Sequence, residues 1–163
     1  MRWCVRSLLL LVAILAAGCT PGPTFDQVSA SLPPPPAGMA RVFVYRDVGS
    51  YQDLSWVPVS FNGGDIGAVG PGKVLMRDVA PGTYTISAKS DGLWPDQDKT
   101  VIVAPGQTIY TKIESLRSLD PTRDRPAWLI TYVVQLVDTV TGRREIGGLW
   151  YSAAAGPTGP GRS

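Results

Sequence analysis

Apolar and polar side chains alternate with a period of two through most of the chain between residues 40 and 151, a pattern typical of half-buried β-strands. In the segment 83–89, for example, Tyr84, Ile86 and Ala88 alternate with Thr, Ser and Lys. The same criterion predicts strands at 41–45, 56–61, 66–69, 73–79, 83–89, around 101–103, 107–116 and 127–137. No long segment has a helical period, so the pattern predicts an all-β domain.

Two of these segments carry more specific expectations. The run 127–137 is the most apolar, which predicts a central strand. Pro58 cannot donate a hydrogen bond to a neighbouring strand, so the segment 56–61 is expected at a sheet edge. Trp56, Trp128 and Trp150 lie in strand-like segments and are expected in the core.

The segment 143–151 is ambiguous. Glu145-Ile146 and Leu149-Trp150 would suit a helical turn, whereas the intervening Gly147-Gly148 opposes one.

Turn residues divide the strands at short, regular intervals. Pro71-Gly72, Pro81-Gly82 and Pro105-Gly106 each separate two strand-like segments, and the segment 62–65 (NGGD) has the composition of a hairpin turn. We therefore expect a single antiparallel β-sandwich of about seven to nine short strands over residues 40–151, with a small barrel as the alternative.

The N-terminus has the features of a secretory signal. Arg2 and Arg6 precede an apolar run that ends in Ala17-Gly18-Cys19. Small residues directly before a cysteine predict a lipoprotein signal peptide at 1–18 and acylation of Cys19. A membrane-spanning helix is the alternative, but the apolar run is about ten residues where a span needs roughly 20.

This junction resembles the lipobox of bacterial lipoproteins. Those proteins usually have Leu three places before the cysteine, where this chain has Ala16, with Leu15 one place further away. Two or more acyl chains give stable anchoring. In Gram-negative relatives an Asp after the cysteine retains the protein in the inner membrane. The resemblance, with Thr20 at that position, implies an outer-membrane lipoprotein that faces the periplasm.

The regions on either side of the predicted domain are low in core-forming residues. The lipidated cysteine and the proline-rich segment at 19–39, which includes four consecutive prolines at 33–36, predict an extended tether tens of ångströms long. A ligand for a proline-binding groove is the alternative interpretation of this segment. The segment 152–163 is rich in Gly, Pro and Ala, which predicts a disordered tail.

Composition excludes several classes of function. Removal of Arg2 and Arg6 with the signal leaves 13 basic and 13 acidic residues, so no excess positive charge favours nucleic acid. Loss of Cys4 and acylation of Cys19 leave no thiol for a disulfide. The chain has no histidine, which excludes Ser-His-Asp catalysis and the usual zinc sites. We expect no cofactor, no bound metal and no enzymatic activity.

Few residues qualify as a candidate site. Trp94, in the loop 90–98, and Tyr51 are candidate contacts for a partner or a glycan, because exposed aromatic rings are enriched at binding sites. Three carboxylates in the same loop would suit a hard cation, but they match no EF-hand spacing, and a solvated loop is the preferred interpretation. For a hydrolase, the candidates are a Ser87–Lys89 pair or Asp96 with Asp98.

Several motifs also carry a resemblance. The segments 40–46 (ARVFVYR), 61–67 (FNGGDIG), 79–84 (VAPGTY) and 101–110 follow one another in the order found in an uncharacterised family of small bacterial lipoproteins. This family is a domain of unknown function. The resemblance covers residues 40–116 and implies a prealbumin-like sandwich, similar to carboxypeptidase regulatory domains, without assigned catalytic residues.

Three hypotheses for function remain. The preferred one is a non-enzymatic, membrane-anchored envelope lipoprotein whose β-sandwich binds another envelope component or stabilises an assembly. The second is a module that binds peptidoglycan or another polysaccharide through Trp94 and Tyr51. The third is a hydrolase with a carboxylate or Ser-Lys site.

Overall fold

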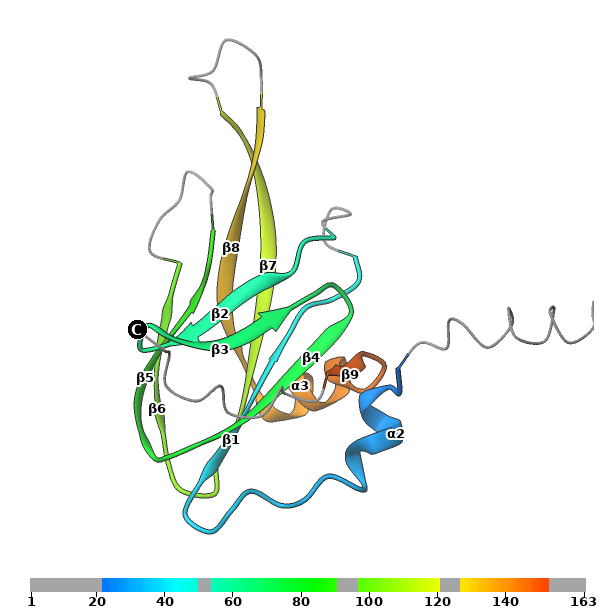
Figure 1. Cartoon of the computed structure of the whole chain (residues 1–163), viewed down its shortest axis with the longest axis vertical. Helices are drawn as coiled ribbons and strands as arrows, with labels where there is room; N and C mark the ends of the chain where they lie inside the picture. Colours follow the sequence, from blue (N-terminus) through cyan, green and yellow to red (C-terminus); the bar gives the residue numbers. More distant parts are fainter. Residues whose placement is uncertain (1–21, 50–53, 91–96, 121–126, 153–163) are drawn as a thin grey trace, which may run out of the picture.

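The fold is mostly β and contains two sheets (Figure 1). The structure is a computed structural model, and it describes residues 22–49, 54–90, 97–120 and 127–152. Its elements, in chain order, are α2 (Phe25–Ser29), β1 (Ala40–Tyr45), β2 (Val57–Phe61), β3 (Gly64–Val69), β4 (Lys73–Val79), β5 (Gly82–Ala88), β6 (Lys99–Val103), β7 (Thr108–Asp120), β8 (Ala127–Val137), α3 (Thr139–Ile146) and β9 (Trp150–Ser152). Each segment predicted as a strand overlaps one of these strands.

The two sheets have the orders β8-β7-β1-β4-β9 and β3-β2-β5-β6. The prediction of a purely antiparallel sandwich is wrong in one respect, because β1 pairs in parallel with β7 and β4 pairs in parallel with β9. Parallel neighbours need a long connection between them. Here the chain builds the whole second sheet between β1 and β7, so these two strands can run in the same direction.

A hydrophobic core fills the space between the two sheets. Its buried members come from both sheets and include Val42, Val44, Val57, Val59, Phe61, Val69, Leu75, Ile86, Val103, Ile109, Ile113, Tyr132 and Val134. The alternation of the sequence is confirmed in β5, where Ile86 is fully buried and Tyr84 and Ala88 pack against the core. Asn62 and Gly63 have positive φ angles of 49° and 78°, as the predicted hairpin turn requires.

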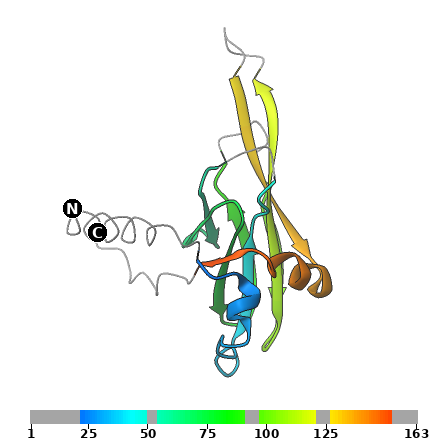
Figure 2. The ribbon, with the colours of Figure 1, turned by 90° about the vertical axis from the view of Figure 1, so that its right-hand side faces the viewer.

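A second core lies on the other face of the five-stranded sheet. Strand β1 is buried along its whole length because Val42 and Val44 face the first core while Phe43 and Tyr45 face the second. Helices α2 and α3 cover this face (Figure 2). The molecule therefore has a helical layer on the outside of the five-stranded sheet, which the sequence pattern did not predict.

The structure corrects the extent of the tether predicted at 19–39. Phe25 of α2 is buried and its ring meets that of Phe43 edge-on, with the centroids 5.2 Å apart. Thr24 caps the start of α2, and its N–H donates to the Gln27 side chain at 2.9 Å. Folding of this segment is favoured because it buries an aromatic ring that a free tether would expose to water.

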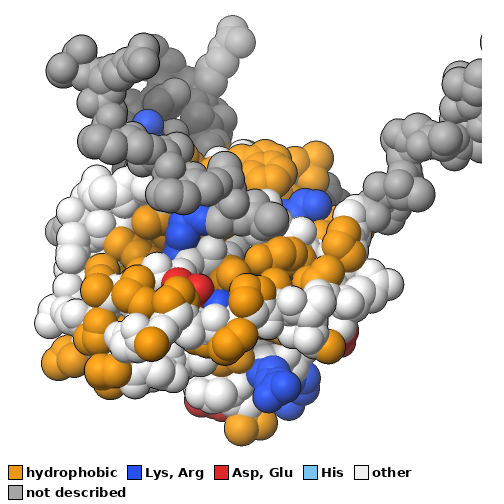
Figure 3. Space-filling model, turned by 60° about the horizontal axis from the view of Figure 1, so that its bottom comes forward, with side chains coloured by type: hydrophobic (Ala, Val, Ile, Leu, Met, Phe, Trp, Pro, Cys, Tyr) orange, Lys and Arg blue, Asp and Glu red, His pale blue; other side chains and the backbone are white. Residues whose placement is uncertain are grey.

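The proline run also contacts the domain. The carbonyl of Pro33 accepts a hydrogen bond from Arg41 at 2.7 Å, and Arg41 also pairs with Asp78 at 2.7 Å. A groove of about 320 Å³ lies between this run, α2 and the sheet. Figure 3 shows hydrophobic side chains, interrupted by charged ones, over this end of the molecule.

The ambiguous segment near the C-terminus contains both a helix and a strand. Asp138 caps the start of α3 by accepting hydrogen bonds from the backbone N–H groups of Val140 and Thr141. The helix ends at Ile146, which is fully buried in the second core. The chain then turns at Gly147-Gly148 into the short strand β9.

Two predicted strand positions are wrong. Strand β8 lies at the edge of its sheet, because β7 is its one hydrogen-bonded neighbour among the described strands. Strand β2 lies inside its sheet, between β3 and β5. Pro58 lies opposite Lys89, one residue beyond the end of β5, and its carbonyl accepts a hydrogen bond from the N–H of Lys89. The N–H that proline lacks therefore lies outside the part of β2 that pairs with β5, so the sheet tolerates Pro58 at this position.

Candidate functional site

None of the site residues in the preferred and glycan hypotheses falls in the described part of the chain. Cys19, Tyr51 and Trp94 lie outside the described residues, as does Asp96. The described Asp98 is exposed. The strands that flank these segments are described, and their ends carry the candidate site.

The strand ends that flank three connections lie at one end of the molecule. Strands β1 and β7 are parallel, so their last residues share this end. Ser90, which follows β5, reaches the same region, because its hydroxyl donates to the carbonyl of Ile130 at 3.1 Å and accepts from the N–H of Tyr132 at 3.2 Å. The connections that contain Tyr51 and Trp94 therefore leave from the same end as the β7–β8 turn.

Large apolar side chains are exposed at this end, where Ser55, between Leu54 and Trp56, lines one hollow together with Trp128. We call the four residues Leu54, Trp56, Leu119 and Trp128 the aromatic end; their exposed fractions are 80%, 57%, 47% and 60%. The expectation that Trp56 and Trp128 lie in the core is wrong. Trp150 is half-buried on β9.

The length of the β7–β8 hairpin explains the exposure of Trp128. Strand β7 has 13 residues and β8 has 11, whereas the strands of the second sheet have five to seven. The hairpin consequently projects beyond the second sheet (Figures 1 and 2). Trp128 lies opposite Leu119 on this projection, and the guanidinium of Arg117 stacks over its ring at 4.7 Å.

A buried arginine, Arg46, holds the backbone segment that carries Leu54 and Trp56. Arg46 is only 2% exposed, lies 5.3 Å from the ring centroid of Tyr132, and donates to the carbonyl of Ser55 at 2.5 Å. This contact fixes the backbone between Leu54 and Trp56. The two side chains are thus presented on a positioned segment, which lowers the entropy lost when a partner binds.

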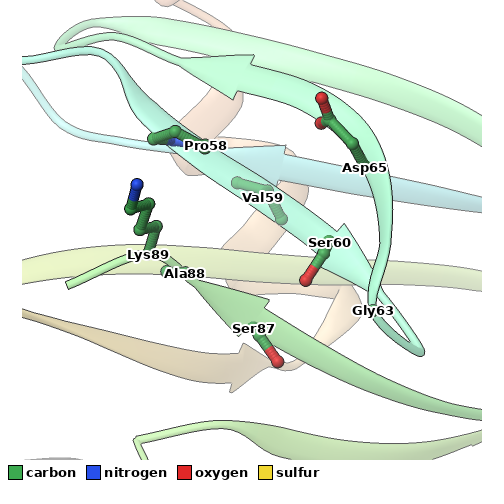
Figure 4. A pocket seen from close by; sticks show the side chains of 8 residues that line it. All are labelled: Pro58, Val59, Ser60, Gly63, Asp65, Ser87, Ala88 and Lys89. Carbon is green, nitrogen blue, oxygen red and sulfur yellow. The ribbon is translucent and has the colours of Figure 1, made fainter.

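A shallow hollow of about 340 Å³ lies on the outer face of the four-stranded sheet (Figure 4). Ser60 and Ser87 face each other in register across β2 and β5, with Lys89 and Asp65 at the margins. Asp65 accepts a hydrogen bond from the N–H of Gly67 at 2.7 Å. The predicted Ser87–Lys89 pair therefore does lie on one face of the sheet, with Ser87 in β5 and Lys89 directly after this strand.

The geometry of this hollow offers little for hydrolysis. A lysine serves as a base beside a serine nucleophile when its amine is removed from water. Lys89 is exposed instead. Hydroxyl, ammonium and carboxylate groups on an open sheet face suit weak contacts with a polar ligand.

A charged cluster joins α3 to the five-stranded sheet. The Lys112 ammonium lies 2.6 Å from Asp47 and 3.3 Å from Glu145, and Glu145 accepts a hydrogen bond from the Tyr45 hydroxyl at 2.7 Å. Burial and this carboxylate raise the pKa of Tyr45 far above its usual value, so Tyr45 remains a donor. The cluster holds α3 in place.

No group of three potential metal ligands occurs among the described residues.

Comparisons with protein-family models, with curated proteins and with solved structures give no match. The resemblance of residues 40–116 to a lipoprotein family therefore stays an expectation. Within the described ranges, no helix has the length and apolar character needed to cross a bilayer.

Proposed function

We propose that this chain is a lipid-anchored, non-enzymatic lipoprotein of the bacterial envelope whose β-sandwich binds another envelope protein through the aromatic end. The anchor part of the proposal is supported by the Ala17-Gly18-Cys19 junction and its basic, apolar leader. The binding part is supported by the exposure of Trp56 and Trp128 at the same end of the sandwich.

The exposure of two tryptophans is the observation that carries the binding proposal. Burial of a large apolar side chain contributes about 1.5–3 kcal/mol, and leaving several exposed together favours association. Tryptophan and arginine are enriched at the energetic centres of protein interfaces. Trp128 with Arg117 stacked on it supplies both residue types on a projecting hairpin.

A protein fits the aromatic end better than a glycan does. Leu54 and Leu119 add aliphatic surface beside the aromatic rings, and a sugar makes better use of polar groups around a ring. The hollow with Ser60, Ser87 and Lys89 has such groups but contains no aromatic side chain. Glycan binding therefore remains the second candidate, and it belongs to the hollow and not to the aromatic end.

Photo-crosslinking in living cells tests this proposal. A photoreactive amino acid at position 119 samples the aromatic end, and the same residue at position 102 is the control, since Ile102 is 77% exposed on the outer edge of the other sheet. We expect a discrete adduct from position 119 that protease removes and lysozyme does not.

Each alternative outcome has a defined meaning. An adduct from 119 that lysozyme digestion collapses would assign the surface to peptidoglycan and overturn the choice of a protein partner. Equal, diffuse adducts from positions 119 and 102 would contradict a binding role for the aromatic end.

A further inference from the structure

The described part of the chain begins already folded onto the domain. The carbonyl of Pro23 accepts a hydrogen bond from the N–H of Tyr151 at 3.0 Å, and Thr24 forms a β-bridge with Trp150. If Cys19 carries the lipid, as the proposed function holds, only the three residues 20–22 separate it from Pro23.

So short a connection limits the distance between the domain and the bilayer. A fully extended chain spans at most about 3.3–3.6 Å per residue, so the four residue steps from Cys19 to Pro23 reach at most about 14 Å. The polar headgroup layer is itself about 5–8 Å thick on each side of the hydrocarbon core. A tether of tens of ångströms, as the proline content alone predicts, is therefore excluded for a chain that folds from Pro23 onward.

The point of attachment lies at one edge of the sandwich. Strand β9 is the last strand of the five-stranded sheet, and the chain enters beside it, away from the projecting β7–β8 hairpin (Figures 1 and 2). We call the residues around this entry the anchor edge: Pro23, Thr24, Val48, Gly72, Lys73 and Trp150. They are contiguous, because the N–H of Trp150 donates to Gly72 at 2.9 Å, and a side chain placed at Gly72 would meet both Val48 and Trp150.

The side chains of the anchor edge suit the surface of a bilayer. Trp150 is half-buried, and the Lys73 ammonium lies 4.6 Å from the centre of its ring. Tryptophan is enriched at the membrane–water interface, and lysine near the surface is attracted to anionic headgroups. Val48, 68% exposed, adds an apolar side chain at the same place.

We propose that the anchor edge rests directly on the phospholipid headgroups, with Trp150, Lys73 and Val48 against the bilayer surface. This inference rests on the proposed lipid anchor at Cys19. It orients the domain, because one edge faces the membrane while Leu119 and Trp128, on the β7–β8 hairpin at the opposite edge of the sheet, stay free for a partner. Trp56 lies nearer the anchor edge, since a Cβ atom added at Gly70 would lie 3.0 Å from its ring.

Thiol labelling of the full lipoprotein tests the orientation. With Cys4 removed and Cys19 acylated, Val48→Cys or Ile102→Cys would carry the only free thiol. Both positions hold exposed β-branched residues, and they lie at opposite edges of the sandwich. In vesicles of phosphatidylethanolamine with a minority of phosphatidylglycerol, we expect a charged maleimide to react several-fold more slowly at position 48 than at position 102.

A flexible insertion supplies the matched control. Twelve Gly/Ser residues inserted after Gly22 extend the tether by about 20 Å on average, so the rates at the two positions should converge. Equal rates without the insertion would overturn the inference. Slow reaction at position 48 that persists with the insertion would also overturn it, because the protection would then come from the protein itself.

Failure of this inference can be separated from failure of the proposed function. Incorporation of a palmitate analogue is measured on the same samples, and its absence would remove the anchor itself. Normal incorporation together with equal labelling rates would reject only the orientation.

Discussion

At the scale of single residues, one glycine has a clear steric requirement. A Cβ atom added at Gly142 would lie 2.4–2.5 Å from the Cγ and Cβ atoms of Tyr110, which cannot move aside without shifting β7. We expect Gly142→Ala to lower the free energy of unfolding by about 1–3 kcal/mol. Gly148→Ala is the control, because no atom lies within 4 Å of its added Cβ.

Thermal or urea unfolding of the two variants measures this difference. Equal stability of Gly142→Ala and Gly148→Ala would show that α3 does not approach Tyr110 this closely.

The tryptophans show how far sequence reasoning reaches at this scale. The period of two correctly assigned the inward face of β5 and β6, where Ile86 and Val103 are buried in the first core. It failed for Trp128, since alternation shows which face a side chain occupies but not whether another sheet covers that face. The contacts of Arg46 with Ser55 and Tyr132 join distant segments, so no local pattern could have predicted them.

At the scale of elements, the docking of α3 should depend on pH. The pKa of Glu145 is lowered chiefly by the hydrogen bond that its carboxylate accepts from Tyr45. Burial acts in the opposite direction, and the Lys112 ammonium lowers the pKa further. A carboxyl group whose pKa is lower in the folded state adds stability above its unfolded pKa of about 4.3 and loses it as the pH falls through the folded value. We expect the wild type to lose more stability than Glu145→Gln between pH 6 and acidic pH.

Unfolding by urea at a series of pH values measures this effect. Asp98→Asn removes a carboxyl group at an exposed site and controls for net charge. Parallel pH profiles for the wild type and Glu145→Gln would contradict a role for Glu145 in holding α3.

Helix α2 provides a second test at this scale. Phe25 fills the second core beside Phe43, so Phe25→Ala should cost about 3 kcal/mol of unfolding free energy. Ser29→Ala, at an exposed position of the same helix, should have little effect. If Phe25→Ala unfolds like the wild type, this segment is a free tether and the correction to the predicted linker is wrong.

The α2 segment was missed because its sequence is proline-rich on both sides. A helix of five residues has little stability of its own, so its formation depends on packing against Phe43 and β9. The same reason applies to α3, whose position depends on the long-range contacts of Tyr45 and Lys112 with Glu145. Local patterns predicted the strands and turns, whereas these helices depend on tertiary contacts.

At the scale of the whole molecule, the two edges of the sandwich differ. The anchor edge carries β9 and the opposite edge carries β8 and β6. The aromatic end extends from Trp56, whose ring lies against Gly70 near the anchor edge, to Trp128 on the projecting β7–β8 hairpin. The two-sheet architecture was predictable from strand count and turn spacing. The mixed strand order was not, since which strands become neighbours depends on how the whole chain is connected.

The most direct test of the account is the effect of Trp128→Ala on crosslinking from position 119 in cells, measured together with the melting temperature of the variant. Trp128 is 60% exposed, so its removal should leave the melting temperature nearly unchanged. The account predicts that the protein adduct from position 119 is lost while the fold is retained. An undiminished adduct, or a loss of adduct that only follows unfolding of the domain, would contradict partner binding by the aromatic end.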